Sequence, residues 1–495
     1  MNSSSTKNHS GQDADVLVIG GGNAGFCAAH AAAARGLNVT ILERGEGDRA
    51  GGNSFFTAGA TRIAHDGLDD LLDLVEPDAR HELSVVPPYS ADEYRADLER
   101  VTEGRTDPEM ADILVSEAAD SLRWLKSLGL KYRLMYERQA YKRPDGSYLF
   151  WGGLHVGNVD GGVGLIADHT RVAKENGVTI LYGVRVLDLI TDEGTVCGVK
   201  AEKDGNSLTF QAKSVIIASG GFEASPKMRG EYMGERWSNA KVRGTPYNVG
   251  DLLTAALKIG AAKGGDWQTC HSVQWDAFHP VNESNIELTN RLTRQSYFLG
   301  LLINKDGKRF LDEGADFRNY TYAKYGKVIL EQPDSLAFQI FDSSLRPHLR
   351  AEEYDMPGIS VEEADSLEEL ANKLGISPST FSETIHEYNE HISDEEFDPT
   401  VKDGKSSDVK PPKSNWATPI AKAPFYAFPV TCGITFTFGG LKGDRDGRVL
   451  NEEGNPIPGL FVCGEALGGL FSTNYPGGSG LAAGCVFGRR AGNAA

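Results

Sequence analysis

One segment near the N-terminus constrains the fold more than any other: DVLVIGGGNAGFCAAHAAAARGLNVTILER, residues 15–44. VLVI predicts a short buried strand, the Ala-rich run predicts a helix closed by a glycine, and NVTILE predicts a second strand. Gly20, Gly22 and Gly25 have the G-x-G-x-x-G spacing, which permits a tight turn, approach of backbone to a pyrophosphate, and close helix–strand packing. Glu43 ends the second strand about 20 residues later, where a carboxylate accepts hydrogen bonds from ribose hydroxyls. We therefore predict a dinucleotide-binding βαβ unit.

Two later segments indicate which dinucleotide is bound. KSVIIASGGFEAS, residues 213–225, predicts a strand ending in two glycines, and VTILYGVRVLDLITDEGTVCGVKAE before it predicts a β-meander. IPGLFVCGEALGG, residues 457–469, predicts a further strand that ends at a Gly-Glu pair. Together with the glycine fingerprint, these segments resemble the glutathione-reductase-like FAD-binding fold. The resemblance implies that Glu465 hydrogen-bonds the ribityl chain of FAD and that the backbone of Val186 meets the adenine.

The segment GGNSFFTAG, residues 51–59, bears on how the flavin is attached. In succinate dehydrogenases the matching loop carries a histidine bonded to the flavin, whereas this chain has Asn53 and Ser54 there. The pattern resembles that of soluble fumarate reductases and implies non-covalent FAD. STNYPGGSGLAAG, residues 472–484, predicts a glycine-rich turn into a helix whose N–H groups face the flavin. The cofactor-binding residues implied are Gly20, Gly22, Asn23, Ala24, Gly25, Glu43, Arg44, Gly52, Asn53, Ser54, Val186, Ser219, Gly220, Gly221, Asn248, Asp251, Gly464, Glu465, Gly478, Ser479, Gly480 and Leu481.

The expected fold class is α/β, a glutathione-reductase-like FAD-binding Rossmann domain with an inserted α+β substrate-capping domain. The glycine-turn rhythm changes near residue 263 and returns near 425. We therefore expect residues 14–262 and 425–495 to form the FAD-binding domain and residues 263–424 to form the capping domain. Within the latter, residues 365–392 predict two capped helices, and residues 393–415 predict a polar, Pro-rich exposed loop.

Several sequence properties bound the class of protein. The formal charge of −19 over 495 residues argues against a nucleic-acid partner and against attraction to anionic membranes, so local cations must hold any anionic substrate. The six cysteines are scattered without CxxC or CxxxxC spacing, which predicts free thiols in a reducing cytoplasm, no metal site and no disulfide reductase activity. No second βαβ unit with GxGxxG is present, which predicts that the chain has no NAD(P)H domain of its own.

The localisation follows from the same properties. No apolar run approaches the ~18 residues that a spanning helix needs. Residues 1–13, MNSSSTKNHSGQD, are polar and lack the apolar core of a signal peptide, which predicts a disordered tail. We expect a cytoplasmic protein that is peripheral to a membrane only through its electron acceptor.

The segment INKDGKRFLDEGADFRNYTYAKYG, residues 303–326, contains the first candidate for chemistry. It resembles the N-x-x-G-x-R-F-x-x-E segment of fumarate reductase flavoproteins, in which a following arginine is the active-site proton shuttle. Arg318 is the matching position, with one more residue between it and Glu313 than in that family. The alternative for Arg318 is a surface salt bridge, and Arg309 and Glu313 are expected to be structural.

Two positions depart from the fumarate reductase pattern. TCGITFTFGGLKGD, residues 431–444, matches a loop that supplies a substrate-binding histidine in that family, but here the position is Phe436, flanked by Thr435 and Thr437. Tyr475 replaces the arginine of the terminal N-R-x-G-G motif. Two carboxylate ligands are therefore missing, which argues against plain fumarate reduction. Tyr-Pro-Gly also resembles 3-ketosteroid dehydrogenases, where the tyrosine donates to a carbonyl oxygen, and this implies a catalytic role for Tyr475.

The fuller run of features resembles tricarballylate dehydrogenases. The matching blocks are GGGNAG, GGNS, RGTPYNVGD, LTRQSYFLGLLIN, DEGADFRNYTYAKYG, TFTFGGL and NYPGGSGLAAGCVFGRRAG, which span nearly the whole chain. That family oxidises propane-1,2,3-tricarboxylate to cis-aconitate with FAD and passes electrons to a membrane partner. The resemblance implies a small polycarboxylate substrate and a separate acceptor, a membrane redox protein or the quinone pool. The substrate-binding residues implied are Arg291, Arg294, Thr435, Thr437, Tyr297 and His271.

Three interpretations remain open at this point. The chain can be an FAD enzyme that dehydrogenates a di- or tricarboxylate beside Arg318, or a flavin enzyme for a neutral ketone such as a ketosteroid, or a non-catalytic flavin-binding protein. Arginines near the start of the capping region favour the first interpretation. Tyr475 is compatible with both catalytic interpretations.

Overall fold

The computed structural model describes residues 9–10, 14–279 and 286–495. The predicted disordered tail, residues 1–13, lies outside the described residues except for β1 (His9–Ser10), which pairs with β13. The chain forms two compact units. The first unit comprises residues 1–234, 244–270 and 436–495, and the second comprises residues 235–243 and 271–435.

The first unit is built on a nine-stranded sheet in which β10, β3, β2, β13, β12 and β11 are consecutive neighbours. Residues Val16 to Ile19 of β2 are all buried, as expected for a strand covered on both faces. β2 pairs in parallel with β3 on one side and β13 on the other. Bounds of the strands of this unit are β2 (Ala14–Ile19), β3 (Val39–Leu42), β4 (Ala60–Thr61), β5 (Ser84–Val85), β6 (Tyr132–Leu134), β7 (Ala140–Lys142), β8 (Tyr148–Phe150), β9 (Val156–Asn158), β10 (Thr179–Leu181), β11 (Arg185–Asp192), β12 (Thr195–Lys203), β13 (Asn206–Ile217), β15 (Lys263–Gly264), β21 (Gly440–Leu441), β22 (Arg448–Leu450) and β23 (Pro456–Val462).

The predicted βαβ unit is confirmed, and the predicted meander is corrected in one strand. β10 pairs in parallel with β3, so it extends the Rossmann sheet. The meander instead consists of β11, β12 and β13, which pair antiparallel in sequence order. The second half of β13 continues into the parallel sheet, between β2 and β23. One long strand thus serves two sheet regions, which the local sequence pattern does not separate.

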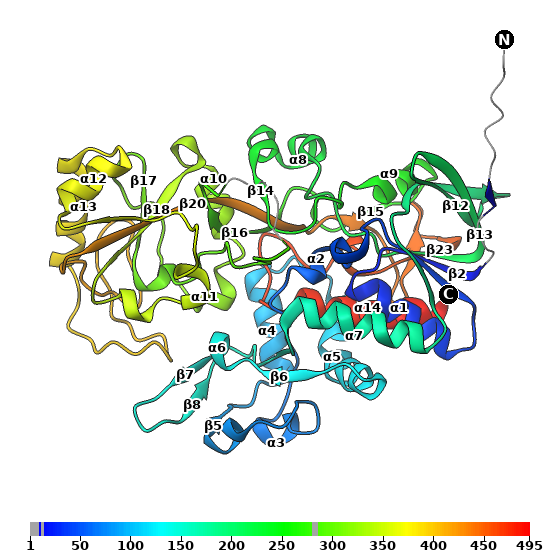
Figure 1. The fold of residues 1–495 in the computed structure, drawn as a ribbon, viewed down its shortest axis with the longest axis horizontal. Coiled ribbons are helices and arrows are strands. Elements are labelled where there is room, and N and C mark those ends of the chain that lie inside the picture. Colours follow the sequence, from blue (N-terminus) through cyan, green and yellow to red (C-terminus); the bar gives the residue numbers. More distant parts are fainter. Residues whose placement is uncertain (1–8, 11–13, 280–285) are drawn as a thin grey trace, which may run out of the picture. The chain divides into compact units, whose positions relative to one another are not determined.

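The last helix packs directly on the first one. Figure 1 shows α14 beside α1, and α7 also packs against α1. A Cβ on Gly488 would lie 2.5 Å from the carbonyl oxygen of Ala24, and one on Gly492 would lie 2.1 Å from that of Ala28. Only glycine permits backbones to approach this closely. Bounds of the helices of this unit are α1 (Asn23–Ala34), α2 (Gly52–Phe55), α3 (Leu68–Leu71), α4 (Ala91–Val101), α5 (Pro108–Leu128), α6 (Tyr136–Gln139), α7 (Gly161–Glu175), α8 (Pro226–Met233), α9 (Asp251–Lys258) and α14 (Ser479–Ala494).

The second unit is an α+β unit around a six-stranded sheet in which β14, β20, β18 and β17 are neighbours. All six residues of β18 are buried. The two helices predicted within residues 365–392 are confirmed as α12 and α13, and their N-cap serines, Ser366 and Ser377, accept from the backbone N–H three residues on. Bounds in this unit are β14 (Lys241–Val242), β16 (Cys270–Asp276), β17 (Leu301–Asn304), α10 (Tyr325–Leu330), β18 (Ala337–Asp342), α11 (Ala351–Tyr354), β19 (Glu362–Ala364), α12 (Leu367–Leu374), α13 (Pro378–Glu390) and β20 (Phe425–Thr437).

The boundaries between the two units differ from the expected ones, which lay between residues 262 and 263 and between residues 424 and 425. β15 pairs with β21 of the first unit, which places the first boundary after Cys270. β20 pairs with β18 over six residues, so residues 425–435 belong to the second unit. β14 also pairs with β20, which assigns residues 235–243 to the second unit. Strand pairing, which local composition does not reveal, sets each boundary.

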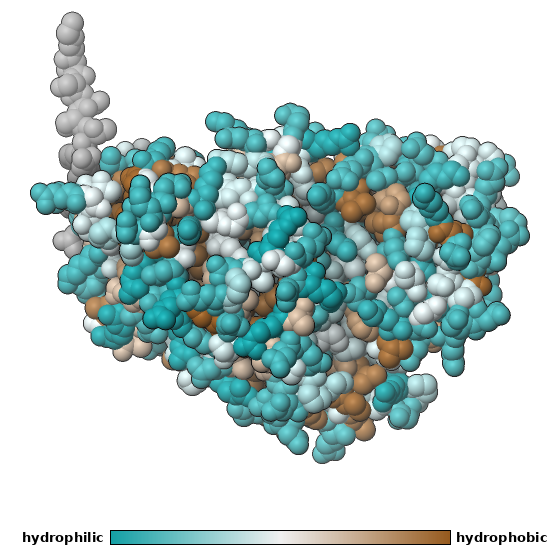
Figure 2. Space-filling model, turned by 180° about the vertical axis from the view of Figure 1, so that it is seen from behind, coloured by the Kyte–Doolittle hydropathy of each residue, from teal (hydrophilic) through white to brown (hydrophobic). Residues whose placement is uncertain are grey.

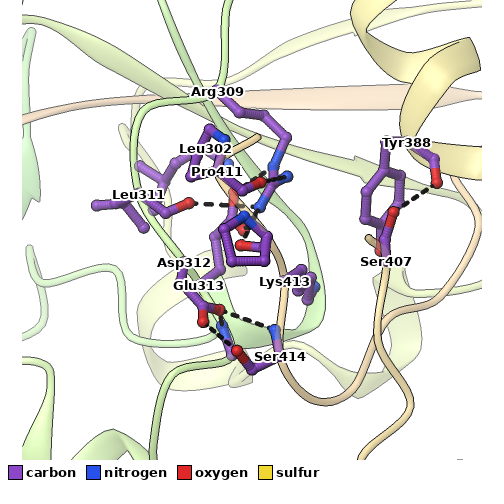
Figure 3. Close-up of polar contacts among 12 residues, drawn as sticks. Leu302, Arg309, Leu311, Asp312, Glu313, Tyr388, Ser407, Pro411, Lys413 and Ser414 are labelled. Atoms are coloured by element: carbon purple, nitrogen blue, oxygen red, sulfur yellow. Dashed lines mark hydrogen bonds and ion pairs between the residues drawn. The ribbon is translucent and has the colours of Figure 1, made fainter. Parts of the chain in front are cut away.

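A buried polar cluster lies within the second unit (Figure 3). The Nε of Arg309 donates to Glu313 Oε1 at 3.1 Å, and its Nη1 donates to the carbonyl oxygen of Pro411 at 2.6 Å. Glu313 also accepts from the backbone N–H of Leu302 at 2.8 Å. These contacts agree with a structural role for both residues. Lys413, in the segment expected to be an exposed loop, is fully buried here, and its ammonium donates to the carbonyl oxygen of Gly300 at 2.7 Å.

Lys413 gives the stability of the protein a distinctive pH dependence. Burial lowers the pKa of Lys413 to about 8 against an ordinary 10.5, with Glu313 opposing the shift. Between these two values the unfolded chain binds more protons than the folded one, so stability rises with pH. Over this pH window we expect the unfolding free energy of the wild type to rise by about 3 kcal/mol more than that of the Lys413→Met variant. One pKa unit corresponds to about 1.4 kcal/mol. Urea titrations of both proteins from pH 7 to 11 measure it, and a pH-independent difference would contradict it.

The surface is mainly polar. Figure 2 shows a face on which hydrophilic residues predominate and hydrophobic residues form small separate groups. Among the described residues, no helix is both long and apolar enough to cross a membrane. The same residues contain no group of three or more His, Cys, Asp or Glu side chains that can hold a metal ion.

Candidate functional site

A pocket opens at the carboxyl ends of the parallel strands of the first unit. This is the edge at which α/β sheets bind ligands. The pocket is lined by Ile19, Gly20, Gly21, Gly22, Asn23, Ala24, Leu42, Glu43, Arg44, Gly52, Asn53, Ser54, Val184, Arg185, Val186, Ala218, Ser219, Gly220, Thr245, Tyr247, Asn248, Val249, Gly250, Asp251, Leu252, Gly464 and Glu465. Of the residues predicted to bind the cofactor, all line it except Gly25, Gly221, Gly478, Ser479, Gly480 and Leu481.

The turn between β2 and α1 is held in place by two residues that contact it, Gly25 and Glu43. Gly25 packs against the turn, since a Cβ there would lie 2.0 Å from the carbonyl oxygen of Gly20. Glu43 accepts from the backbone N–H of Gly21 through Oε2 and from that of Gly45 through Oε1, both at 2.6 Å. Burial raises the pKa of Glu43, and these two N–H groups partly offset the rise. Each carboxylate oxygen keeps a second lone pair for a ribose hydroxyl.

One end of the pocket is bounded by a charged and aromatic group. Arg44 lies over the ring of Tyr247 at 5.1 Å from its centroid and donates to the backbone oxygen of Tyr247 at 3.0 Å. Arg185 binds Asp251 through two nitrogens, at 2.8 and 3.2 Å. Asp251 begins α9, so it also lies favourably at a helix N-terminus. Val186, the residue predicted to meet the adenine, lies beside Arg185 in this wall.

Asn23 connects the turn to two other elements. Its backbone N–H donates to Ser54 Oγ at 3.0 Å, and its Nδ2 donates to the backbone oxygen of Leu481 at 3.0 Å. His169 Nε2 lies 3.0 Å from Asn23 Oδ1, and His30 contacts the other ring nitrogen of His169 at 3.1 Å. Burial, and for His169 also the neighbouring His30, lowers the pKa of each histidine, so both rings are neutral. The contact with Leu481 brings the first turn of α14 to the cofactor-binding turn.

The start of α14 is fixed by residues that the sequence did not single out. Tyr94 donates to the fully buried Ser479 hydroxyl at 2.9 Å. Arg62 is fully buried, and its Nε donates to the backbone oxygen of Gly477 at 2.8 Å. Gly478 is the N-cap, with φ of 84°. The N–H groups of the first turn are thus held rigidly, as an anion-stabilising helix N-terminus requires.

Tyr475 belongs to an aromatic cluster formed by Phe436, Phe438, Phe471 and Tyr475. Its ring meets the ring of Phe436 edge-on at 5.2 Å and 89°, and that of Phe471 at 5.4 Å and 77°. Phe438 meets Phe436 at 5.3 Å. A Cβ on Gly480 would lie 3.7 Å from Phe436, so the cluster adjoins the first turn of α14. The ring of Tyr475 therefore packs, and the role of its hydroxyl remains a prediction.

In the second unit, Arg318 is buried rather than paired on the surface. It begins a short 3₁₀ helix, Arg318–Tyr320, and its Nη1 donates to Gln295 Oε1 at 2.6 Å. Arg350 donates to the same amide oxygen at 3.1 Å and approaches Glu353 at 3.3 Å. Glu353 in turn accepts from the backbone N–H of Gln295 at 2.8 Å. Two guanidinium groups thus converge on one neutral acceptor.

A further arginine lies among the predicted substrate-binding residues. Arg243 Nη1 donates to the hydroxyl of Thr435 at 3.1 Å. Burial, together with the charge of Arg243, lowers the pKa of His271 well below its ordinary value, so this histidine is neutral. The ring of His271 meets that of Tyr322 at 5.0 Å. The sequence did not single out Arg243 as a ligand, although it is the first residue of the quoted segment RGTPYNVGD.

Three predicted substrate-binding residues have structural contacts instead. Arg294 is fully buried in an ion pair with Asp276 at 2.7 Å, which occupies its guanidinium. Arg291 is exposed and donates to the backbone oxygen of Glu287 at 2.9 Å. Tyr297 is buried, its hydroxyl lies 2.6 Å from Thr321 Oγ1, and burial raises its pKa. None of these contacts presents a group for a carboxylate.

The remaining predicted residues lie in the first unit. Thr437 donates through its backbone N–H and its hydroxyl to Glu465 Oε1, at 2.8 and 3.2 Å, and thereby orients a residue of the pocket wall. Asn53 accepts from the backbone N–H of Thr245 at 2.8 Å and donates to Glu223 at 2.7 Å. Glu223 was also missed by sequence reasoning, although it directly follows the predicted Gly-Gly-Phe turn.

A Rossmann sheet with a glycine-rich turn, an acidic second strand and a pocket at its carboxyl edge defines a dinucleotide-binding protein. The FAD binding domain model matches residues 15–481, so the chain belongs to this family of FAD-binding proteins. It is 28% identical over 493 residues to the probable fumarate reductase Ifc3 of Shewanella frigidimarina (strain NCIMB 400), covering 97% of this chain and 74% of that protein. It is 26% identical to 3-oxosteroid 1-dehydrogenase of Mycolicibacterium smegmatis, covering 95% of each.

The fold also resembles a solved flavoprotein. A flavocytochrome c3 fumarate reductase in its open conformation matches with a TM-score of 0.72 and 26% identity, over 98% of this chain and 78% of that one. The chain is thus an FAD-dependent oxidoreductase acting on CH–CH donors, and its relatives include a probable fumarate reductase and a 3-oxosteroid 1-dehydrogenase.

The pocket fits FAD. Its glycine turn leads into the N-terminus of a twelve-residue helix, where backbone N–H groups bind phosphate. Glu43 and Glu465 supply acceptors for hydroxyl groups along the same wall. The two-electron chemistry is supplied by the isoalloxazine ring of the cofactor, which accepts a hydride equivalent.

Proposed function

We propose that the protein dehydrogenates a C–C single bond next to a carboxylate, converting tricarballylate to cis-aconitate or acting on a similar polycarboxylate. The observation that carries the proposal is the convergence of Arg318 and Arg350 on Gln295. Arg350 also pairs with Glu353 at 3.3 Å, so two guanidinium groups and one carboxylate surround a single amide. In a chain with a formal charge of −19, such a local concentration of cations suits an anionic substrate.

In this proposal three arginine side chains supply the positive charge and the proton transfer. Oxidation removes a hydride equivalent from one carbon and a proton from its neighbour. Arg318 is the proposed proton-transfer residue. Arg243 and Arg350 are the proposed carboxylate ligands, since a guanidinium group binds a carboxylate through two parallel hydrogen bonds. They take the place of Arg291 and Arg294, whose side chains have other contacts.

The electrons must leave through a separate acceptor. The chain contains one GxGxxG motif, and the described residues of the first unit contain one Rossmann sheet. We propose a membrane redox protein or the quinone pool as the acceptor. Titration of the substrate-reduced protein with a soluble quinone analogue and with NAD⁺ tests this, and reoxidation by NAD⁺ would contradict it.

A second candidate is a dehydrogenase for a neutral cyclic ketone. The specific observation in its favour is the aromatic cluster, in which Phe436 stands at the position of a substrate-binding histidine of fumarate reductases. Aromatic edges and faces suit an apolar ring better than a carboxylate. In this candidate Tyr475, a member of the cluster, is the proposed donor to a carbonyl oxygen.

One experiment separates the two candidates. The oxidised holoprotein is mixed anaerobically with tricarballylate, succinate or a 3-ketosteroid, and loss of flavin absorbance is followed. Bleaching by tricarballylate supports the first candidate, and bleaching by the steroid alone would overturn it. Dithionite reduction serves as the control that the bound flavin is redox-active. A flavin that dithionite reduces but none of the three compounds bleaches would overturn both candidates.

Tyr475→Phe separates the hydroxyl of this residue from its ring. The ring contacts with Phe436 and Phe471 are retained, so we expect folding and FAD content to be unchanged. If the hydroxyl binds a substrate oxygen, its loss costs about 1–3 kcal/mol of transition-state stabilisation, as for a polar contact in a water-poor site. Steady-state kcat/KM against wild type measures this loss. Unchanged kinetics would leave the residue as packing.

A further inference from the structure

Two glutamate side chains of the first unit meet next to the FAD pocket. Glu223 lies two residues beyond the glycine pair that follows β13, and Glu465 is the middle residue of the short 3₁₀ turn after β23. Their carboxyl groups lie close enough to interact with each other. Glu223 is fully buried, whereas Glu465 is partly accessible because it lines the pocket. The pair therefore has an inner member and an outer member.

The inner carboxyl is oriented by two amides. Asn53 Nδ2 and Asn248 Nδ2 both donate to Glu223 Oε1 at 2.7 Å. Among the described residues, no donor reaches Glu223 Oε2. Leaving a carboxylate oxygen buried without a donor is costly. The carboxyl group of Glu465 is the partner that remains, and it can donate only when it carries a proton.

The outer carboxyl is oriented by its own donors. Thr437 donates to Glu465 Oε1 through its backbone N–H at 2.8 Å and through its hydroxyl at 3.2 Å. Gly221 contributes a further backbone hydrogen bond. A Cβ on Gly221 would lie 2.3 Å from Glu465 Oε1, so glycine is needed for this approach. Glu465 Oε2 is thus left for the partner carboxyl and the pocket.

The charges around the pair do not allow both members to ionise. Arg229 is the neighbouring cation, and it is directed at the backbone oxygen of Glu223 rather than at either carboxyl group. The other groups facing the pair are the neutral Asn53, Asn248 and Thr437. Burial, and then the charge of Glu223, raises the pKa of Glu465 well above its ordinary value, and burial raises that of Glu223. Two close carboxyl groups in such a setting share a proton.

We propose that Glu223 is a positioning residue that shares one proton with Glu465, so that the pocket-lining carboxyl stays neutral and the negative charge rests on the buried one. The two asparagines fix this polarity by holding Oε1 of Glu223 as the ionised acceptor. The proposal rests on the FAD pocket and is independent of the substrate class.

The arrangement has a consequence for the flavin potential. A reduced flavin carries more negative charge than the oxidised form, and an ionised carboxylate in the pocket wall would oppose reduction through a weakly screened interaction. A proton held on Glu465 removes that opposition. The pair also provides a group that can gain a second proton when negative charge accumulates nearby.

Glu223→Gln tests which of the two carboxyl groups carries the proton, with Glu465→Gln as the matched variant. In Glu223→Gln the asparagines hold the amide oxygen, so the amide nitrogen faces Glu465, donates to it and leaves it ionised. In Glu465→Gln the amide nitrogen donates to Glu223, and the charge stays on the buried residue. Both variants keep the total charge of the pair, but only the first places it at the pocket.

Two measurements read this out. Infrared difference spectra against wild type should show that both variants lose the C=O band of a protonated carboxyl group, which is identified by its shift in D₂O. Redox titration of the bound flavin should give a lower midpoint potential for Glu223→Gln and a potential close to wild type for Glu465→Gln. If Glu223→Gln does not fold, the infrared band in Glu465→Gln decides alone. A band that persists in either variant, or equal potentials in wild type and Glu223→Gln, would overturn the proposal.

Discussion

Arg318→Lys is expected to lower turnover by about 10²–10⁴-fold while the protein keeps its FAD, which is the range that general acid–base groups contribute. The variant keeps a positive charge but loses the planar fork and its reach. Arg318 lies in the second unit, buried, with Nη1 on Gln295, whereas the FAD pocket is lined by residues of the first unit. Cofactor content should therefore be unaffected. Stopped-flow reduction of the flavin by substrate measures the chemical step directly.

Arg350→Lys is the matched control for this prediction. Arg350 donates to the same Gln295 oxygen, so the variant perturbs the same hydrogen-bonded group without removing the proposed proton-transfer residue. It should raise KM more than it lowers kcat if it binds a carboxylate. An Arg318→Ala enzyme with wild-type turnover would exclude Arg318 from the mechanism. Equal losses of kcat in Arg318→Lys and Arg350→Lys would assign the effect to the shared amide contact.

Arg294→Ala is expected to destabilise the protein by about 3–5 kcal/mol, because it leaves Asp276 as a buried, unpaired charge. Both side chains of this pair are fully buried. Although burial alone raises the pKa of Asp276, the charge of Arg294 and hydrogen bonds from Ser360 hold that pKa below its ordinary value. Loss of the guanidinium removes the main compensation. Urea unfolding followed by tryptophan fluorescence measures the change.

Arg291→Ala is the control, because Arg291 is exposed and contacts only a backbone oxygen among the hydrogen bonds described for its side chain. It should change stability by less than about 0.5 kcal/mol. The double variant Arg294→Met/Asp276→Leu should recover most of the lost stability, since a buried ion pair is often replaceable by apolar residues. If Arg294→Ala unfolds like wild type but raises KM, Arg294 binds substrate and the structural interpretation is wrong.

The sequence predicts the cofactor half of the protein well because its signals are local. Gly20, Gly22 and Gly25 lie within six residues, and a short apolar run and an Ala-rich run flank them directly. A βαβ unit has one handedness, so the position of Glu43 beside the turn follows from the chain itself. The acidic strand end and the glycine turn accordingly line one pocket in the structure.

Other features depend on contacts between distant segments and were not predictable. Nothing near Glu223 indicates that residue 465 approaches it. Lys413 lies in a polar, Pro-rich stretch that predicts exposure, yet tertiary packing buries it completely. Arg294 belongs to a residue type that binds carboxylate substrates. Only the structure shows that its guanidinium group is paired with Asp276. In each case the residue type indicated a possible role, but the contacts with residues distant in sequence determine the actual role.

The packing of α14 on α1 also has a consequence for how the protein is made. The helix that carries the phosphate-binding turn is complete at residue 34, but its close-packed partner begins at residue 479. During synthesis the face of the first helix that α14 covers therefore stays uncovered until residues 479–494 have left the ribosome. Because Asn23 of the cofactor-binding turn bonds to Leu481 of α14, we expect stable cofactor capture to wait for the synthesis of this last helix.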